Sequence, residues 1–322
     1  MKQHLPYIDN LKGFLILLVV LGHCIQNTDA DFDHNIVFRY IYSFHMPLFM
    51  CISGFVSYKP HTEWLTVRKR FVQLIIPFLA WAILVSCIKW NFSAFPDKIL
   101  HPDTGLWFLW ALFFIVLILK LCEDTARRIG VRSEYVIVAC SLIMVGIMVV
   151  LKFKLFGFQF IAWYFIFYCM GYFGKKYEDK IRRFGKSTAW ILLAIFVTAA
   201  YYWMRKDPPT FMPTESSMIY NYAYKLIVAT IACTAFISLF KHHVNHNLLI
   251  INKLWGGVTL GIYAIHQSVI TAFLALIDDI CEPKTAYIFF IFLLWIAVTV
   301  TSYLIYLALK RNHYTSLLFL GK

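Results

Sequence analysis

Long apolar runs recur along the whole chain and are separated by short polar segments. Each run has roughly 17–25 residues, which is the length that an α-helix needs to cross about 30 Å of hydrocarbon. The runs lack the alternation of apolar and polar positions that is typical of membrane-spanning β-strands. The pattern therefore predicts ten membrane-spanning helices, at about residues 8–27, 36–58, 70–90, 104–121, 134–151, 157–174, 187–204, 218–240, 254–276 and 285–309.

The composition agrees with a membrane as the solvent. Of the 322 residues, 61% are hydrophobic and only 15% are charged, and a soluble globular domain would expose more polar surface than that. No small-residue cleavage site follows the first apolar run, so we expect that run to stay as a span. We find no long linker and no convincing repeat, and we predict a single all-α helical bundle over residues 1–322.

The positive charges predict an orientation. The net charge is +13, and lysine and arginine concentrate on the cytoplasmic side of short loops. Here they follow the second, fourth, sixth and last runs, at Lys59, Arg68, Lys69, Arg70, Arg127, Arg128, Arg132, Lys175, Lys176, Lys180, Arg182, Arg183, Lys186, Lys310, Arg311 and Lys322. The loops between them are acidic or nearly neutral, with Asp29, Asp31, Asp33, Asp97, Asp103, Asp278, Asp279 and Glu282. We therefore predict that both termini are cytoplasmic and that the positive charge does not indicate binding to nucleic acid.

Ionisable side chains in the first run are candidates for chemistry, because such groups are expensive in hydrocarbon. Asp9, Lys12 and His23 are three and eleven residues apart, and at about 100° per residue they share one helix face. Eleven residues span roughly 16 Å, so we expect Lys12 near the cytoplasmic edge and His23 beyond the bilayer middle. A plain ion pair between Asp9 and Lys12 is the alternative for those two residues.

The second run brings another imidazole to a similar depth. It enters from the opposite side, and His45 lies roughly 12–14 Å along it. An imidazole can take a proton from an alcohol and return one to a leaving group, so His23 and His45 are candidate catalytic residues. Each can also be a hydrogen-bonded packing residue. Pro47 interrupts the hydrogen bonding of this helix and frees a carbonyl for a cavity.

Polar groups at the ends of other runs are candidates for binding. Ser53 lies where small residues permit a close helix approach, which is also routine packing. Arg68 and Arg70 can hold the phosphates of a nucleotide-bearing donor or act only as a positive-inside anchor. Trp107 can contact a sugar ring or belong to an aromatic belt.

One late apolar run carries a further candidate imidazole. His266 lies in mid-span beside Tyr263, and the two can line a cavity or only pack. We expect no metal site, because the eight cysteines stand singly and a polar loop explains His242, His243 and His246.

Several short motifs stand in a distinctive order: Asp9-Asn10-Leu11-Lys12-Gly13, Val19-Val20-Leu21-Gly22-His23, Phe44-His45-Met46-Pro47-Leu48-Phe49 and Ile52-Ser53-Gly54-Phe55. Weaker motifs follow, namely Arg68-Lys69-Arg70 with Pro77, Trp107-Phe108-Leu109, and Gly261-Ile262-Tyr263 with His266. Together they resemble the integral-membrane acyltransferase-3 family, specifically its fucose 4-O-acetylase-like branch. The resemblance covers most of the chain.

This resemblance implies a ten-helix bundle in the bacterial plasma membrane. Such a protein takes an acyl group, usually acetyl, from cytoplasmic acyl-CoA and passes it to a hydroxyl of a sugar, glycan or lipid-linked acceptor. The implied partners are the bilayer, acyl-CoA as co-substrate and a carbohydrate acceptor. Many members carry an arginine and a histidine with ten residues between them in the first span, and Lys12 stands here at the arginine position without the guanidinium fork.

The hypothesis that follows makes His23 the general base on the acceptor hydroxyl, with His45 assisting or orienting. Direct transfer and an acyl-histidine intermediate both stay open. Lys12, Arg68 and Arg70 hold the CoA phosphates in this scheme. The other substrate-binding candidates are Asp9, Ser53, Trp107, Tyr263 and His266.

Two other functions compete with an enzyme. A permease or flippase for a polar metabolite could use the same histidines to relay protons or bind its cargo. Against it, the sequence has no pair of interrupted helices that would mark a midplane substrate site. A membrane anchor or sensor without chemistry would leave the matched depths of His23 and His45 unexplained.

Overall fold

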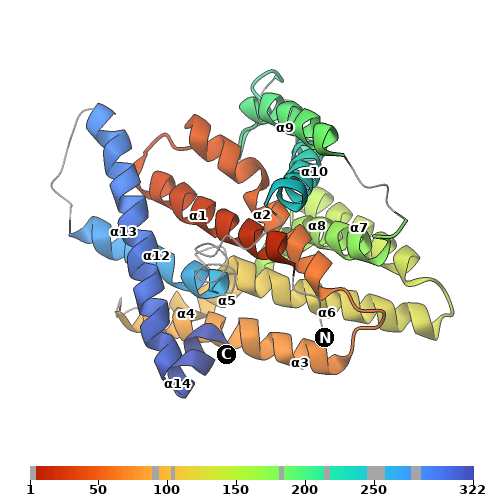
Figure 1. Ribbon diagram of the computed structural model, residues 1–322. Coiled ribbons are helices and arrows are strands. Elements are labelled where there is room, and N and C mark those ends of the chain that lie inside the picture. Colours follow the sequence, from red (N-terminus) through yellow and green to blue (C-terminus); the bar gives the residue numbers. More distant parts are fainter. Residues whose placement is uncertain are drawn as a thin grey trace. The chain divides into compact units, whose positions relative to one another are not determined.

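The computed structural model describes residues 5–88, 94–102, 106–180, 185–213, 218–244, 258–276 and 284–322 (Figure 1). These residues form helices, turns and loops without a strand, and the predicted all-α membrane protein is confirmed. Some residues used for the predicted orientation or considered for metal binding lie outside the described ranges, namely Asp103, Arg182, Arg183, His246, Asp278, Asp279 and Glu282.

Each of the ten predicted runs has a helical counterpart. The long helices are α1 (Pro6–Thr28), α2 (Ile36–Ser57), α6 (Trp107–Arg128), α7 (Ser133–Val150), α8 (Phe158–Lys176), α9 (Lys186–Tyr201), α10 (Met218–His243), α12 (Thr259–Ala275) and α13 (Lys284–Arg311). The third run is divided into α3 (Trp64–Arg70), the π-helical turn η1 (Phe71–Ile75) and α4 (Ile76–Ile88). Short elements follow at α5 (Ala94–Leu100), η3 (Leu155–Gly157), α14 (His313–Thr315) and η4 (Ser316–Leu320).

Within the described residues, seven helical segments are long and apolar enough to cross a membrane. They are Pro6–Thr28, Ile36–Ser57, Trp64–Cys87, Ser133–Val150, Leu155–Lys176, Met218–His243 and Ile288–Arg311. Helices α9 and α12 are apolar but shorter, and α6 carries Lys120, Glu123 and Asp124 in its C-terminal half. The chain is therefore a multi-pass membrane protein, while the count of ten spans and the orientation stay predictions.

Contacts divide the chain into two compact units. The first unit comprises Met1–Phe49 and Arg182–Leu307, and the second comprises Met50–Ile181 and Ala308–Lys322. Helices α2 and α13 each contribute residues to both. The single bundle over residues 1–322 stays a prediction.

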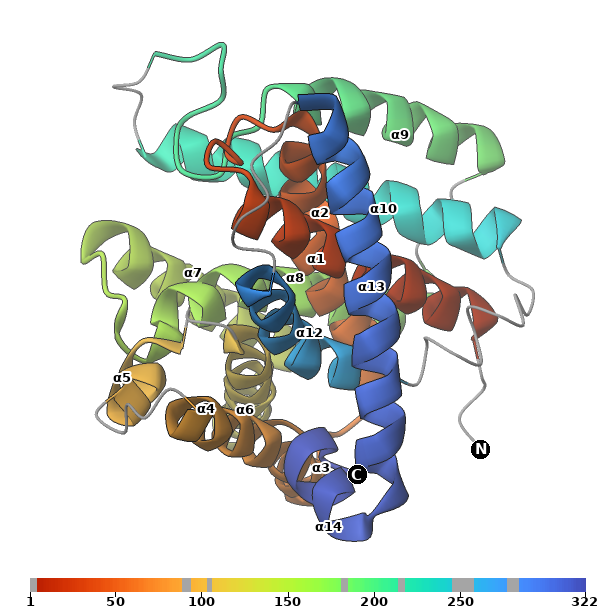
Figure 2. The same cartoon turned by 90° about the vertical axis from the view of Figure 1, so that its left-hand side faces the viewer.

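The first unit is organised around α1. This helix packs against α10 and α12, and α10 in turn lies along α9 (Figure 2). Two polar side chains tie α1 to distant segments: Asn10 donates to the Val244 carbonyl at 2.8 Å, and Trp295 of α13 donates to the Leu17 carbonyl at 2.9 Å. Bonds from side chains to main-chain carbonyls satisfy polar groups that the hydrocarbon could not solvate.

The second unit contains a very close crossing of α2 and α8. A Cβ atom added at Gly54 would overlap the carbonyl of Tyr168, and one added at Gly171 would overlap the carbonyl of Cys51. Small residues let membrane helices approach in this way, because lipid offers no hydrophobic drive and close packing has to hold the helices together. The close approach that the sequence predicts around Ser53 and Gly54 is therefore present.

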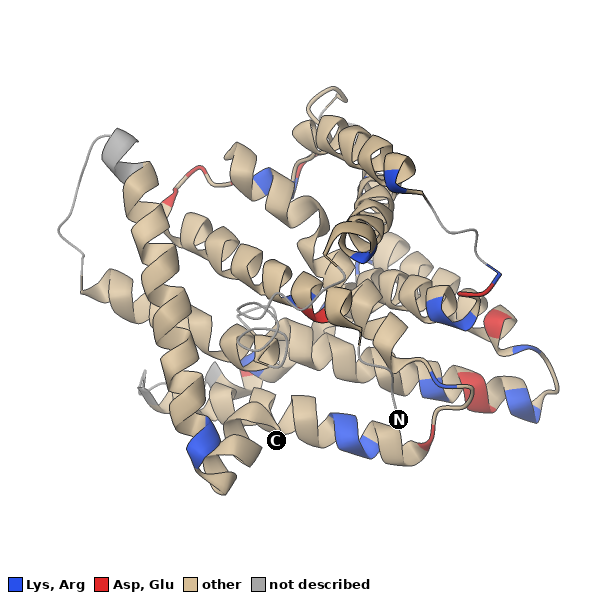
Figure 3. Cartoon of the chain, viewed as in Figure 1, with Lys and Arg blue, Asp and Glu red and all other residues tan. Residues whose placement is uncertain are grey.

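Charged side chains of the second unit gather where α6 ends, α7 begins and α8 ends (Figure 3). Ion pairs link these helix ends: Lys176 lies 2.9 Å from Glu134, and Arg132 lies 3.4 Å from the same carboxylate. Such a charged end is expected of a helical unit whose other surfaces face hydrocarbon.

Substituting Gly171 with alanine tests the helix crossing. We expect Gly171→Ala to lower the unfolding temperature and the yield of folded protein, because overpacking costs about 1–3 kcal/mol. Gly174→Ala is the matched control on the same helix, since nothing lies within 4 Å of its added Cβ. Thermal unfolding in detergent measures both variants, and equal unfolding temperatures would contradict the close crossing.

Candidate active site

His23 is held by two polar side chains of the first unit. Its Nδ1 lies 3.1 Å from the Oε1 atom of Gln26, one turn further along α1. Tyr42 of α2 donates its hydroxyl to the same oxygen at 2.8 Å and lies 3.5 Å from His23 Nδ1. An amide oxygen only accepts hydrogen bonds, so Nδ1 of His23 carries the proton and Nε2 keeps its lone pair.

His266 of α12 faces His23, with 5.0 Å between the ring centroids. Its Nδ1 lies 2.7 Å from the Tyr263 carbonyl and 3.2 Å from the Ile262 carbonyl, so it is also a donor. The side chain is 1% exposed, and its Nε2 has no hydrogen-bond partner among the described residues. A buried acceptor left in this state costs about 1–3 kcal/mol, which the hydrogen bond of a ligand would recover.

His45 of α2 has the same hydrogen-bonding pattern. Its Nδ1 donates to the Ile41 carbonyl at 2.7 Å, which leaves Nε2 as the acceptor. The Tyr42 ring lies 4.8 Å from the His45 ring and 6.2 Å from the His23 ring, so tyrosine stands next to both imidazoles. Pro47, inside α2, follows directly on this part of the helix.

The start of α2 is anchored where α9 ends, which positions Tyr42 and His45. Arg39 is buried and donates to the carbonyls of Trp203, at 2.7 Å, and Tyr201. A helix C-terminus offers unpaired carbonyls and a partial negative charge, and the guanidinium satisfies both.

The arrangement is a cluster of three imidazoles that each offer an Nε2 lone pair. We call His23, His45, His266 and Tyr42 the histidine cluster. Acceptor nitrogens cannot pair with one another, so their complement is a ligand that brings several hydroxyl hydrogens. A hydroxyl bound to such a nitrogen can be deprotonated as it attacks an electrophile, which is general-base catalysis.

The sequence predicted that His23 and His45 reach a similar depth, and it gave His266 as a separate binding candidate. The His266 ring lies against His23, and Tyr42 stands beside both predicted residues. Sequence reasoning missed Tyr42 and Gln26 as site residues. Each lies three residues from a candidate histidine on the same helix, and that spacing was the available signal.

Asp9 and Lys12 form a local pair at the other end of α1. Their charged groups are 3.4 Å apart, and about a quarter of each side chain is exposed. This is the plain ion pair that the i,i+3 spacing allows. Tyr263 lies nearer the cluster, with its ring centroid 5.7 Å from that of His266.

The other predicted binding residues belong to the second unit. Ser53 is half-buried and Arg68 is exposed. Arg70 donates to Gln73 at 3.1 Å and to Ser57 at 3.2 Å. The Trp107 ring stacks on Phe160 and Tyr164 at centroid distances of 4.6 and 4.9 Å, which gives it a packing partner whatever else it contacts.

No group of three or more His, Cys, Asp or Glu side chains suits a metal ion within the described ranges. His242 and His243 lie at the end of α10, and His246 falls outside those ranges.

The sequence as a whole matches a known protein family. The acyltransferase domain of the acyltransferase-3 family matches residues 5–307. Two curated relatives are the nodulation protein NolL of Sinorhizobium fredii, 32% identical over 189 residues, and that of Mesorhizobium japonicum, 32% identical over 185 residues. The aligned part covers 53% and 51% of this chain, and the chain spans about half the length of these relatives, 49% and 46%. No solved structure matches the chain significantly.

The hydrogen bond between His23 and Gln26 predicts which ring nitrogen of His23 carries the proton. We expect the Nδ1–H tautomer in the intact protein and a mixture of tautomers in Gln26→Leu, because the acceptor oxygen is lost. Nitrogen-15 NMR of labelled histidine distinguishes the two forms. Asn27→Leu is the control, since Asn27 donates to the His23 main-chain carbonyl and not to the ring. An unchanged His23 signal in Gln26→Leu would contradict the assigned role of Gln26.

Proposed function

We propose a specific reaction for this chain, which belongs to the acyltransferase-3 family. As a multi-pass protein of the bacterial plasma membrane, it moves an acyl group, acetyl in the simplest case, from cytoplasmic acyl-CoA to a hydroxyl of a sugar, glycan or lipid-linked sugar. The observation that carries this proposal is the histidine cluster, because its acceptor nitrogens complement a hydroxyl-bearing ligand.

The proposed chemistry is a direct transfer. The acceptor hydroxyl oxygen attacks the thioester carbonyl carbon while its proton passes to Nε2 of His23. The tetrahedral intermediate then collapses, the carbon–sulfur bond breaks, and the thiolate of CoA takes the proton back from His23. The products are an ester and free CoA, and His23 returns to its starting form.

His23 suits the role of base because a second residue fixes its ring. Gln26 accepts from Nδ1 and so directs the Nε2 lone pair towards the reacting hydroxyl. His266 and His45 also donate through Nδ1 and leave Nε2 as the acceptor. They would hold other hydroxyls of the acceptor or orient the hydroxyl that reacts. A polyhydroxylated acceptor is therefore a better complement to the cluster than a simple alcohol.

Positively charged side chains support acyl-CoA as the donor in this proposal. Basic side chains such as Arg68 and Arg70 stand in the second unit, whose helix ends carry most of its charge (Figure 3). Arginine recognises phosphate through paired hydrogen bonds, and CoA is rich in phosphate. Lys12 is a weaker candidate for this task, because Asp9 already pairs with it.

Replacing His23 tests the proposed function. We expect His23→Ala to lower the rate of transfer from labelled acetyl-CoA by about 10²–10⁴-fold, the usual contribution of general acid–base catalysis. The assay measures label in a carbohydrate or lipid-linked sugar fraction of membranes that contain the protein. His34→Ala is the matched control, since His34 is exposed in the loop before α2 and pairs only with Asp31 among the described residues.

Retained turnover in folded His23→Ala would overturn the assignment of the base. A permease would behave differently from the outset: it would move its cargo without consuming acetyl-CoA, and CoA would not raise its unfolding temperature. Stabilisation of the intact protein by CoA is therefore expected, and its absence together with a lack of transfer would overturn the enzyme.

A further inference from the structure

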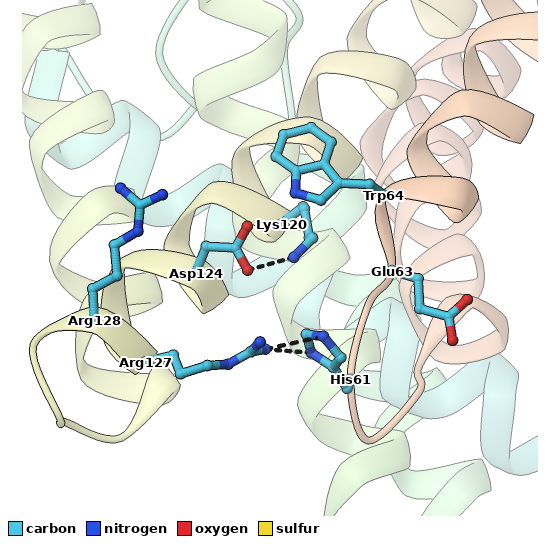
Figure 4. Close-up of a pocket in the computed structure, with 7 residues that line it drawn as sticks. All are labelled: His61, Glu63, Trp64, Lys120, Asp124, Arg127 and Arg128. Atoms are coloured by element: carbon cyan, nitrogen blue, oxygen red, sulfur yellow. Dashed lines mark hydrogen bonds and ion pairs between the residues drawn. The ribbon is translucent and has the colours of Figure 1, made fainter.

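A pocket that the histidine chemistry does not use lies in the second unit. It is formed by the loop between α2 and α3 and by the C-terminal half of α6, and its volume is about 470 Å³ (Figure 4). That is within the range of pockets that hold small organic ligands. Its lining residues are His61, Glu63, Trp64, Lys120, Asp124, Arg127 and Arg128.

The two arginines that line the pocket have no carboxylate paired with them among the described residues. Lys120 pairs with Asp124, and this hydrogen bond holds the pKa of the Asp124 carboxyl below its usual value, so those two charges cancel. Arg127 Nη2 lies 2.6 Å from Nδ1 and 3.0 Å from Nε2 of His61, a ring that brings no negative charge. In the part of the chain that the structure describes, neither Arg127 nor Arg128 has an ion pair, and Glu63 points away from them (Figure 4).

The loop that closes this pocket is held by a buried carboxylate. Glu123 is 7% exposed and accepts hydrogen bonds from the amide and the hydroxyl of Thr62, both at 3.1 Å, and from the hydroxyl of Tyr172 at 2.7 Å. Thr62 stands between His61 and Glu63, so Glu123 fixes the loop in place. A cluster of arginines that served only to orient the protein in the membrane would not need such a support.

An aromatic ring completes the pocket. Trp64 is 53% exposed, and the Lys120 ammonium lies 5.4 Å from its ring centroid. A half-exposed indole beside two guanidinium groups that have no ion pair among the described residues is the combination that binds a nucleobase and its phosphates, through stacking and charge-assisted hydrogen bonds.

We propose that this pocket binds the phosphorylated nucleotide end of the acyl donor, with Arg127 and Arg128 on phosphate oxygens and Trp64 against the base. The inference rests on the proposed function in that the donor is acyl-CoA. It differs from the sequence prediction, which gave the phosphates to Lys12, Arg68 and Arg70. The headgroup of an anionic lipid offers the same phosphate chemistry, and the experiment has to separate the two sources.

The probe is adenosine 3′,5′-bisphosphate, which carries the base and phosphates without the thioester. Its binding to the full chain in zwitterionic nanodiscs is measured by calorimetry for the intact protein and for Arg127→Gln/Arg128→Gln. We expect the double substitution to weaken binding by about ten- to hundredfold. Arg132→Gln is the matched control, because Arg132 follows the same helix and pairs with Glu134 outside the pocket. Trp64→Ala is expected to weaken binding by about tenfold.

Equal affinity of the intact protein and the double variant would overturn the inference. The inference would also be overturned if the double variant bound the bisphosphate normally but, unlike the intact protein, no longer favoured nanodiscs that contain phosphatidylglycerol. The pocket would then bind lipid. Both side chains are exposed, and we expect the variant to fold, which thermal unfolding checks.

Transfer assays keep this inference separate from the proposed function. The double variant should show a raised KM for acetyl-CoA and an unchanged kcat, since His23 is intact. Transfer with an unchanged KM would overturn the pocket and leave the enzyme standing. Bisphosphate binding that depends on Arg127 and Arg128, in a protein that transfers nothing, would support the pocket and overturn the enzyme.

Discussion

Hydrogen-bond satisfaction without water is the constraint on which the rest of this structure depends. A polar group inside a membrane protein has to find its partner within the protein, and the three imidazoles of the histidine cluster do so through Nδ1. The acceptors are the Gln26 amide for His23 and main-chain carbonyls one turn back for His45 and His266. Because every Nδ1 is a donor, every Nε2 becomes an acceptor. The chemistry of the cluster follows from that choice.

The same constraint explains how the cluster is held. Arg39 and Asn10 would be costly in hydrocarbon, and both donate to carbonyls of segments far away in the sequence. In the second unit, Glu123 has three donors around it. Buried polar networks of this kind lock a geometry, since breaking one bond leaves a partner unsatisfied. Rigid positioning is what a base and a binding pocket require.

The two units carry contrasting chemistry. In the first, the described site residues are neutral acceptors beside a tyrosine hydroxyl, suited to a hydroxyl-bearing ligand. In the second, arginine and a half-exposed indole suit an anionic, aromatic ligand. In the proposed reaction, these two kinds of recognition would serve the carbohydrate acceptor and the phosphorylated donor.

Local patterns in the sequence determined the all-α membrane fold, the positions of the helices and the family motifs around His23 and His45. Hydropathy and spacing act over a few turns of one helix, and they are legible in a single chain. Only the tertiary structure decided that His266 meets His23 and that His61 meets Arg127, since 243 and 66 residues separate the members of these pairs. The partners of Nδ1 lie within one turn of the same helix, at Gln26, Ile41 and Tyr263, but only the side-chain conformations in the structure decide which ring nitrogen meets them.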